Sequence, residues 1–517
     1  MRRVSFLFAL LLLAVDVSAQ MSPTQTSPTT PGTLLRNVLI FDGAGSAPVR
    51  GDVRIAGDRI AAVGAGLAPL AGETVIDEHG LALAPGFIDM HSHAGDGIFK
   101  QRTAGVMVRQ GITTALIGQD GGSEFPLADF LAHLDREPAA MNFASMSGQG
   151  TLREQVMGKG QDLLRPSTAA ELGRMRALLT ADMKAGAFGL STGLEYDPAH
   201  FSTTDEVVEL SKVAAAYGGF YISHVRDEGN EVFKSFDEVL EIGRRGGLPV
   251  EITHIKLGTT PVWHLAAKRM PLLFAAAGRG HIRLTADVYP YTFWHSDIRV
   301  IMLDRDYFNP KKVAKVIAEN GGADRIHVVH YGPQPAMNGK DLAQIAKAWH
   351  MTPVEAYMRI VKATMPQADG KEPEEDVIVE SMSEDDLRWF IADPNIMYCT
   401  DGGLTMQHPR SAGSFPRILG RYARDLKLLS MQEAIRKMTS MPAQHLGLAD
   451  RGKVAPGYVA DLVLFDPATI LDQSTLEKWD APPLGIPAVM VSGQWVVRDG
   501  KITGALPGKV LRHAAKQ

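Results

Sequence analysis

Short apolar segments alternate with longer amphipathic segments through the middle of the chain. Residues 169–185 carry apolar side chains at intervals of three and four, the period of a helix with one buried face. Residues 203–217 show the same spacing and open with a Thr-Thr-Asp sequence that caps helices well. The apolar segments between such stretches are predicted strands, at 83–89, 113–117, 142–146, 187–191, 220–223, 250–253, 283–287 and 396–399.

Strands that alternate with helices in this way predict a parallel (β/α)8 barrel. The segment 294–388 is too long for a single crossover, so we expect an insertion with extra helices over the mouth of the barrel. The two ends differ, because 34–84 and 451–505 contain short strands broken by Gly and Asp turns. We therefore predict an α/β protein in which 85–450 form the barrel and both ends of the mature chain build a small β-sandwich domain.

The first residues are predicted to be a targeting signal. Two arginines precede a mostly apolar run at 4–15, and the small residues at 17–19 fit signal-peptidase cleavage. A membrane anchor is the alternative, but a run of about 12 residues is too short for a hydrocarbon core of roughly 30 Å. We predict a signal peptide at 1–19, a Thr/Ser/Pro-rich linker at 20–33, and export to the periplasm or the medium without stable membrane insertion.

Composition narrows the class of partner and of metal ligand. The net charge is −5 and charged residues make up 21% of the chain, so nucleic acid and anionic membranes are not expected partners. Cys399 is the only cysteine, which excludes an intramolecular disulfide and a thiolate zinc finger. Metal ligands are therefore expected to be histidines and carboxylates.

Residue types that bind metal ions or move protons follow several of the predicted strands. They are His91 and His93 after the first strand, Asp120 after the second, His224 at the end of the fifth, His254 at the end of the sixth, and Asp401 after the eighth. The carboxyl ends of the strands of a (β/α)8 barrel meet at one face. These residues are therefore expected to converge, although they are far apart in the sequence.

Each of these residues also has an ordinary structural interpretation. The chain has 16 histidines, and His133, His281 and His350 are expected to be surface or core residues. Asp120 lies in Gln-Asp-Gly and Asp401 in Thr-Asp-Gly-Gly, and both sequences are typical of turns. Their place beside the histidines favours a role in the site.

The segment 84–93, Ala-Pro-Gly-Phe-Ile-Asp-Met-His-Ser-His, resembles the amidohydrolase superfamily. The finer resemblance is to the N-acyl-D-amino-acid deacylases (D-aminoacylases), and it covers nearly everything after residue 33. Its motifs lie at 111–114, 189–196, 224–228, 253–256, 287–291 and 408–417. The resemblance implies a terminal β-sandwich, an insertion before the eighth strand, and hydrolysis of an N-acyl-D-amino acid to a carboxylate and a D-amino acid. The D-stereospecificity rests on the resemblance alone.

The resemblance also implies a zinc site and a general base. One tightly held Zn²⁺ would be bound by Asp120, His224 and His254, and a second, weaker ion by His91, His93 and Asp120. The metal would activate a water molecule, whose proton Asp401 would take and then return to the leaving amine.

Substrate contacts follow from the same resemblance. The substrate carboxylate needs a cationic partner, and the implied partner is Arg410, for which a surface ion pair is the alternative. The further contacts that the resemblance implies are Lys256, Tyr196 and Tyr289. The small-molecule N-acyl amino acid is the only partner expected, and the sequence does not specify its side chain or the oligomeric state.

Two positions depart from the pattern of the family. Its second-strand ligand is usually a cysteine in an Asn-Cys-Gly turn, whereas this chain has Gln119-Asp120-Gly121. A carboxylate can still bridge two ions, but it is a harder ligand than a thiolate, so metal preference and occupancy are expected to change. The other departure is Gln149, which stands where the family has a histidine and puts one peripheral contact in doubt.

Two other functions stay open at this point. A related hydrolase could act as a dipeptidase or as a cyclic amidase of the dihydroorotase type, although no lysine obviously replaces Asp120 as a carbamate bridge. A non-catalytic exported binding protein is the other alternative, and the complete set of candidate ligands argues against it.

Overall fold

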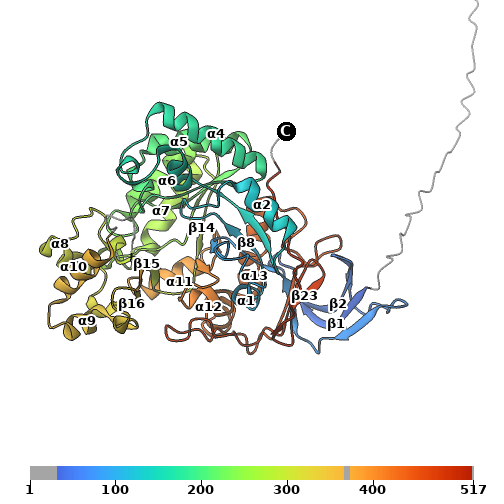
Figure 1. Ribbon diagram of the computed structural model, residues 1–517. Coiled ribbons are helices and arrows are strands. Elements are labelled where there is room, and N and C mark those ends of the chain that lie inside the picture. Colours follow the sequence, from blue (N-terminus) through green and yellow to red (C-terminus); the bar gives the residue numbers. More distant parts are fainter. Residues whose placement is uncertain (1–31, 366–372, 515–517) are drawn as a thin grey trace, which may run out of the picture.

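The structure is a computed structural model that describes residues 32–365 and 373–514 (Figure 1). The predicted signal peptide at 1–19 lies outside the described residues, as does the predicted linker at 20–33 apart from its last two residues. None of the described helices combines the length and apolar character that crossing a bilayer requires.

The central part of the described chain is a barrel of eight parallel strands. In chain order these are β6 (Phe87–Asp89), β8 (Ile112–Ile117), β9 (Asn142–Ser145), β11 (Gly189–Gly193), β12 (Phe220–His224), β13 (Val250–Ile252), β14 (Leu284–Val288) and β19 (Ile396–Tyr398). Hydrogen bonds close the ring where the ladders stop: Phe188 N donates to Ser145 O (2.9 Å) and Met90 N to Tyr398 O (3.5 Å). The predicted (β/α)8 barrel is confirmed.

Short strands extend the barrel at the carboxyl end. β10 (Ser147–Gly148) pairs with β11, and β7 (Ser92–His93) pairs with β20 (Gly402–Gly403). The second pair joins the segment after the first barrel strand to the segment after the last one. Residues from the two ends of the barrel sequence are thereby held side by side at its mouth.

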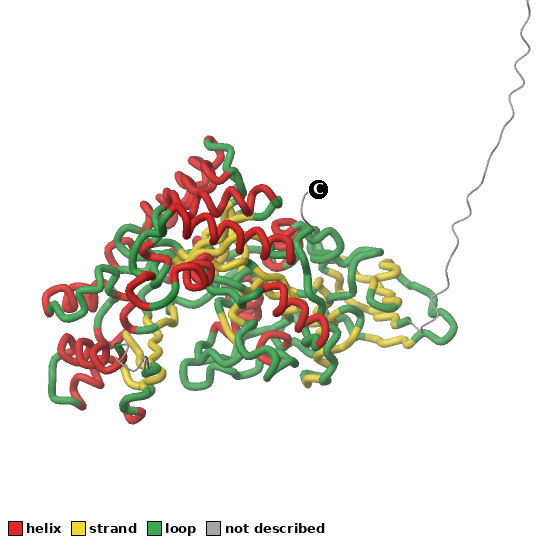
Figure 2. The backbone as a smooth tube through the Cα atoms, turned by 45° about the horizontal axis from the view of Figure 1, so that its top comes forward, coloured by secondary structure: helices red, strands yellow, loops and turns green. Residues whose placement is uncertain are grey.

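Helices surround the barrel strands (Figure 2). They are α1 (Gly105–Val108), α2 (Leu127–Arg136), α3 (Gln149–Met157), α4 (Ala169–Ala185), α5 (Thr204–Ala216), α6 (Val232–Gly246), α7 (Ala266–Arg279), α11 (Glu384–Ala392), α12 (Arg410–Arg417), α13 (Met431–Met438) and α14 (Ser440–Leu446). The bounds of α4 follow from local chemistry. Thr168 and Glu171 form a reciprocal capping box at its start, and Gly186 (φ 114°) ends it in a conformation that suits glycine.

Strand alternation divides the apolar side chains between two cores. Ile88 points into the barrel, whereas its neighbour Phe87 packs outward and stacks on Phe415 of α12 with ring centroids 5.6 Å apart. Leu446 of α14 and Leu511 join the cluster inside the barrel. The interior is therefore a packed core, and the site must lie above it.

Residues 508–513 run along the amino end of β9. Phe143 N donates to Lys509 O (3.0 Å), Leu511 N donates to Phe143 O (2.7 Å), and His513 N donates to Gly186 O (3.0 Å). This late segment of the chain occupies the space between β9 and β11, which do not pair with each other along their length.

The strand-rich ends of the chain form one mixed sheet of nine strands, in the order β24-β23-β22-β21-β5-β1-β2-β3 with β4 beside β1. The strands are β1 (Thr33–Ile40), β2 (Val49–Ala56), β3 (Arg59–Gly64), β4 (Thr74–Asp77), β5 (Ala82–Pro85), β21 (Leu462–Phe465), β22 (Ala488–Val491), β23 (Gln494–Arg498) and β24 (Lys501–Ile502). The sheet curls back on itself, because Ile60 N donates to Tyr458 O (2.9 Å) and Ala460 N donates to Asp58 O (2.8 Å). It encloses a separate apolar cluster that includes Leu35, and it is the predicted small β domain built from both ends.

The predicted strand 83–89 is two strands that belong to different domains. β5 pairs within the curled sheet and β6 within the barrel, with Gly86 between them. A Cβ at residue 86 would collide with the side chain of Thr113, so glycine allows the two domains to join at this point.

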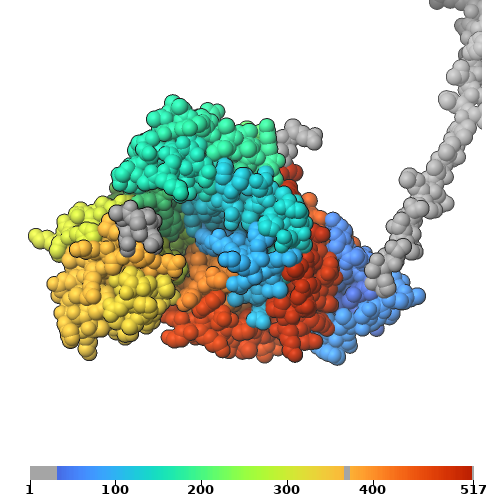
Figure 3. Space-filling view, viewed as in Figure 1, coloured from blue at the N-terminus to red at the C-terminus, as the bar shows by residue number. Residues whose placement is uncertain are grey.

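The insertion before the last barrel strand has its own sheet and its own core. β15 (Trp294–Ser296), β16 (Ile326–Tyr331), β17 (Lys340–Asp341) and β18 (Glu375–Val379) form an antiparallel sheet in the order β15-β18-β16-β17. α8 (Pro310–Glu319), α9 (Leu342–Ala348) and α10 (Pro353–Thr364) pack with it. The sequence pattern predicts only the helices, and the structure adds the sheet. Figure 3 shows the insertion as a yellow-to-orange lobe on the opposite side of the barrel from the blue N-terminal strands.

Candidate functional site

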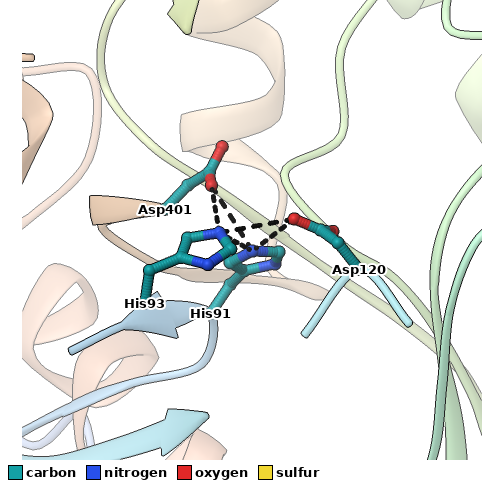
Figure 4. Close-up of side chains that lie close together, drawn as sticks. All are labelled: His91, His93, Asp120 and Asp401. Carbon is teal, nitrogen blue, oxygen red and sulfur yellow. Dashed lines mark hydrogen bonds and ion pairs between the residues drawn. The ribbon is translucent and has the colours of Figure 1, made fainter. Parts of the chain in front are cut away.

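Four of the predicted site residues meet in one group at the mouth of the barrel (Figure 4). Nε2 of His91 and Nε2 of His93 lie 3.2 Å apart. Each of these nitrogens lies 3.3 Å from Asp120 Oδ2 and 3.4 Å from Asp401 Oδ1. A tetrahedral ion with bonds of about 2.1 Å separates its ligand atoms by about 3.4 Å. The group therefore has the dimensions and the donor types of a site for a divalent metal ion.

A second group shares Asp120 but uses its other oxygen. His224 Nδ1 and His254 Nε2 lie 3.1 Å apart, and Asp120 Oδ1 lies 3.3 Å from His254 Nε2 and 3.9 Å from His224 Nδ1. The three donors can hold one ion and leave a coordination position open, as catalytic zinc sites do. The structure thus brings together all six residues that the strand ends predict.

Three of these residues have left-handed backbone conformations. The φ angles are 53° for Asp120, 34° for His254 and 49° for Asp401. Such conformations are uncommon outside glycine and often occur at functional sites, where the surrounding structure holds them. For Asp401 part of that support is the bond from its own amide to His91 O (2.9 Å). Asp120 and Asp401 are therefore turn residues and site residues at the same time.

Outer hydrogen bonds fix the orientation of three imidazole rings. Thr253 Oγ1 lies 2.6 Å from His91 Nδ1 and itself donates to Asp287. Glu195 Oε2 lies 2.7 Å from His224 Nε2, and Glu228 Oε1 lies 3.1 Å from His254 Nδ1. In each of the three rings, one nitrogen faces the other donors and the second nitrogen contacts one of these outer residues. This is the usual arrangement around metal-binding histidines.

The electrostatics of the site favour a bound cation. Burial opposes protonation of His93, yet hydrogen bonds to Asp120 and Asp401 and their charges raise its pKa to about 10. Burial and Lys256 also oppose protonation of His254, but the surrounding carboxylates raise its pKa to about 10 as well. The charges that draw protons to these rings also attract a divalent cation.

Asp401 and Arg410 form a buried ion pair at the edge of the first group. Arg410 Nη1 lies 2.7 Å from Asp401 Oδ2, and Arg410 is only 2% exposed. The interpretation of Arg410 as a surface ion-pair residue is therefore wrong. Burial would raise the pKa of Asp401, but Arg410 and the nearby histidines hold it well below its usual range. Asp401 is thus an ionised carboxylate able to accept a proton.

A cavity of about 640 Å³ opens beside both groups and contains three of the four predicted substrate contacts: Tyr196, Lys256 and Arg410. The ring of Tyr196 lies 4.4 Å from that of His224, measured between centroids. Lys256 donates to both oxygens of Glu228, at 2.6 and 2.7 Å. The fourth predicted contact, Tyr289, is buried. The Cζ atom of Arg410 lies over its ring, 4.8 Å from the ring centroid.

Glu195 and Glu228 are site residues that the sequence pattern does not single out. Glu195 follows β11 and Glu228 follows β12, so their place after strand ends was an available signal. By contrast, Gln149 is buried and its side chain donates to Glu206 (2.7 Å), which also accepts from Arg153. In this chain the departure at Gln149 affects internal packing.

A (β/α)8 barrel with histidine and carboxylate donors at its mouth is the arrangement expected of a metal-dependent amidohydrolase. A sequence model of the amidohydrolase family matches residues 74–497. This chain belongs to the amidohydrolase family, as the resemblance predicts.

Particular relatives narrow the comparison. D-aminoacylase of Alcaligenes xylosoxydans xylosoxydans is 35% identical over 507 residues, which cover 93% of this chain and 98% of the relative. A solved D-aminoacylase, studied for the role of its binuclear metal centre, has a TM-score of 0.81 and 32% identity, over 93% of this chain and 99% of its own. The N-acyl-D-glutamate deacylase of Bordetella bronchiseptica was solved with zinc and a phosphonate mimic of the tetrahedral intermediate. It has a TM-score of 0.80 and 30% identity, with the same coverage.

Proposed function

We propose that this protein is a zinc-dependent N-acyl-D-amino-acid deacylase that releases a carboxylate and a free D-amino acid. The observation that carries the proposal is the pair of donor groups that share Asp120, with Asp401 and the buried Arg410 beside them. Relatives over nearly the whole chain are deacylases of N-acyl-D-amino acids, and one of them was solved with zinc.

Each residue of the site has a separate role in the proposed hydrolysis. Bound zinc would lower the pKa of a water molecule and polarise the scissile carbonyl. Asp401 accepts the proton of the attacking water as a general base and returns it to the leaving amine as a general acid. Arg410 faces the substrate carboxylate, while Tyr196, Lys256 and Tyr289 shape the surrounding pocket.

The charges of the cavity indicate a substrate with one carboxylate. Among the described residues that line it, Lys256 is paired with Glu228, Lys312 with two aspartates and Lys315 with Glu319. Arg410 is paired with Asp401 through Nη1, but its guanidinium lies at the wall of the cavity beside the donor groups. One substrate carboxylate therefore has a partner, and a second one does not.

The start of the insertion contributes both polar and apolar residues to the wall of the same cavity. The apolar ones include Trp294 on β15 and the neighbouring residues Val300, Ile301 and Met302. Burying an unpaired carboxylate against these apolar residues is costly, whereas an apolar side chain gains contacts there. We therefore infer that the preferred D-amino acid has a neutral, apolar side chain.

A substrate panel tests this function. We expect kcat/KM for N-acetyl-D-leucine to exceed that for N-acetyl-D-glutamate and N-acetyl-D-aspartate by about 100-fold, equivalent to about 2.8 kcal/mol. N-acetyl-L-leucine should not be hydrolysed, and chelation should remove activity that added zinc restores. Preference for a dipeptide or a cyclic amide would assign another amidohydrolase reaction, and unchanged activity after thorough chelation would refute the metal-dependent mechanism.

We also propose that the protein is exported to the periplasm or the medium. The support is the arginine pair, the apolar run and the small residues within positions 1–19. Expressed at full length in a Gram-negative host, the protein should be recovered outside the cytoplasm with Gln20 as its first residue. Recovery of the uncleaved chain in the cytoplasm would contradict this proposal.

A further inference from the structure

We propose that two buried residues outside the donor groups, His408 and Asp472, are positioning residues for Arg410, because they fix the helix α12 on which it lies. This role rests on the proposed function, in which Arg410 meets the substrate carboxylate. It gives a purpose to a histidine that the site does not otherwise use. It also assigns part of substrate recognition to the segment 466–487 of the small β domain, which connects β21 to β22.

His408 lies directly before the start of α12 and uses both of its ring nitrogens. The backbone amide of Arg410 donates to Nδ1 (2.9 Å), so the hydrogen of the neutral ring is on Nε2, which donates to the carbonyl oxygen of Phe293 (3.1 Å). The side chain is completely buried. Burial and the charge of Arg410 hold the pKa of His408 well below its usual range. A neutral imidazole therefore ties the backbone of Arg410 to the segment between β14 and β15.

Aromatic rings from that segment pack around His408. Its ring centroid lies 5.0 Å from that of Phe293, 6.0 Å from that of Tyr291 and 6.4 Å from that of Tyr289. Tyr289 is also the ring under the guanidinium of Arg410. The backbone and the charged end of Arg410 are thus both held by this group. A long side chain held at both ends has little rotamer freedom left to lose when it binds a ligand.

Asp472 fixes the same helix from the small β domain. It is buried, and its Oδ2 accepts hydrogen bonds from the hydroxyl of Tyr291 (3.1 Å) and from Nη1 of Arg417 (3.0 Å). Arg417 is the last residue of α12, and its Nε donates to the carbonyl oxygen of Pro290 (2.9 Å). One carboxylate therefore joins the end of α12 to the aromatic segment that packs around His408.

Gly413 lets α12 approach both neighbours closely. A Cβ at this position would collide with the hydroxyl of Tyr291 and lie 3.0 Å from Cβ of Asp472. The helix is therefore packed tightly at its middle and bonded at both ends. The place of the Arg410 guanidinium is set by residues that need not touch the substrate. A displacement of about 1 Å in a group that positions substrate can cost about 100-fold in rate.

Two substitutions of His408 separate the hydrogen bonds of its ring. In His408→Asn the side-chain oxygen can still accept from the amide of Arg410, a contact that asparagine commonly makes with the backbone two residues on. In His408→Gln the longer amide can reach Phe293 but leaves the amide of Arg410 without its acceptor. We expect KM for N-acetyl-D-leucine to rise about 10- to 100-fold in His408→Gln, with KM for N-acetyl-D-leucinamide nearly unchanged. His408→Asn should keep both KM values close to those of the unaltered protein.

Asp472→Asn tests the contribution of the small β domain, because it keeps the shape of the side chain and removes the charge that faces Arg417. We expect KM for N-acetyl-D-leucine to rise about 10-fold, and KM for the amide to stay nearly the same. Asp480→Asn and His281→Asn are matched controls, because both residues are exposed and the first lies in the same segment. Thermal unfolding reports the folded fraction of each variant. Loss of folded protein alone would lower kcat for both substrates without changing either KM.

Binding of D-leucine, the product that keeps the carboxylate, gives a readout that does not need turnover. Its Kd, measured by calorimetry, should rise in His408→Gln and in Asp472→Asn and stay unchanged in the controls. Unchanged KM and Kd in a folded variant, or equal changes for the acid and the amide, would overturn the positioning role of that residue and leave the deacylase assignment intact. If the unaltered protein binds D-leucine but hydrolyses none of the N-acyl amino acids, the proposed function is wrong, and the Kd values decide the positioning role.

Discussion

Replacing Asp401 with asparagine is expected to lower kcat by about 1,000-fold or more while leaving the ion at Asp120, His224 and His254 in place. The carboxylate is held ionised by Arg410 and faces the first donor group, where it can take a proton. General acid and base catalysis contributes about 100- to 10,000-fold in rate, and here one residue would perform both steps. The amide of asparagine has a similar shape but cannot accept that proton.

The measurement is single-turnover and steady-state hydrolysis of N-acetyl-D-leucine, together with the zinc content of each sample. Glu231→Gln is a suitable control, because it removes an exposed carboxylate from the cavity wall without touching the donor groups. An Asp401→Asn enzyme with normal kcat would assign the proton transfers elsewhere. Loss of zinc together with activity would show that Asp401 acts mainly on metal retention.

Replacing Arg410 with alanine is expected to raise KM for N-acetyl-D-leucine by about 100-fold or more. Removing one member of a buried, charge-assisted contact commonly costs about 2–5 kcal/mol, and 1.4 kcal/mol is a factor of ten. The same change removes the positive charge beside Asp401, which raises the pKa of that carboxylate toward its ordinary value. The acid limb of the kcat/KM profile should therefore move to higher pH.

A substrate without the carboxylate separates the two effects of Arg410. N-acetyl-D-leucinamide cannot form the contact, so its KM should be nearly the same in the unaltered and Arg410→Ala enzymes. The KM of the Arg410→Lys enzyme for N-acetyl-D-leucine should lie between those of the unaltered and Arg410→Ala enzymes, because an ammonium keeps the charge but not the bidentate hydrogen bonds of a guanidinium. If the acid and the amide lose affinity equally in Arg410→Ala, the arginine supports Asp401 and does not recognise the carboxylate.

The sequence predicts the barrel and the convergence of its site residues because both depend on repeated local patterns. Each barrel strand is a short apolar run. The carboxyl ends of all eight strands lie at one face of the barrel, so the residues there converge whatever the length and sequence of the loops. This reasoning places His91 beside His254, although the pair is far apart in the chain. The β domain follows from similar patterns at the two ends.

Features that depend on side-chain geometry could not be predicted in this way. The place of Glu195 and Glu228 after strand ends marks them as candidates, but their contacts with His224 and His254 depend on which ring nitrogens turn inward, and no spacing reveals that. The pairing of Arg410 with Asp401 requires the start of α12 to lie beside the segment that follows β19 and contains β20. The sheet of the insertion was missed because the strand pattern at 326–331 lies between helices and pairs with a distant partner at 375–379.

The position of residues 508–513 between β9 and β11 has a consequence for how the molecule is assembled. The gap beside β9 can be filled only after residues 508–513 have left the ribosome, and the pairing of β5 with β21 must wait for residues 462–465. Neither domain is complete before these late residues are made, so folding is dominated by contacts of large sequence separation and is expected to be slow. The nascent chain must therefore keep apolar strands shielded from aggregation until residues 508–513 are available.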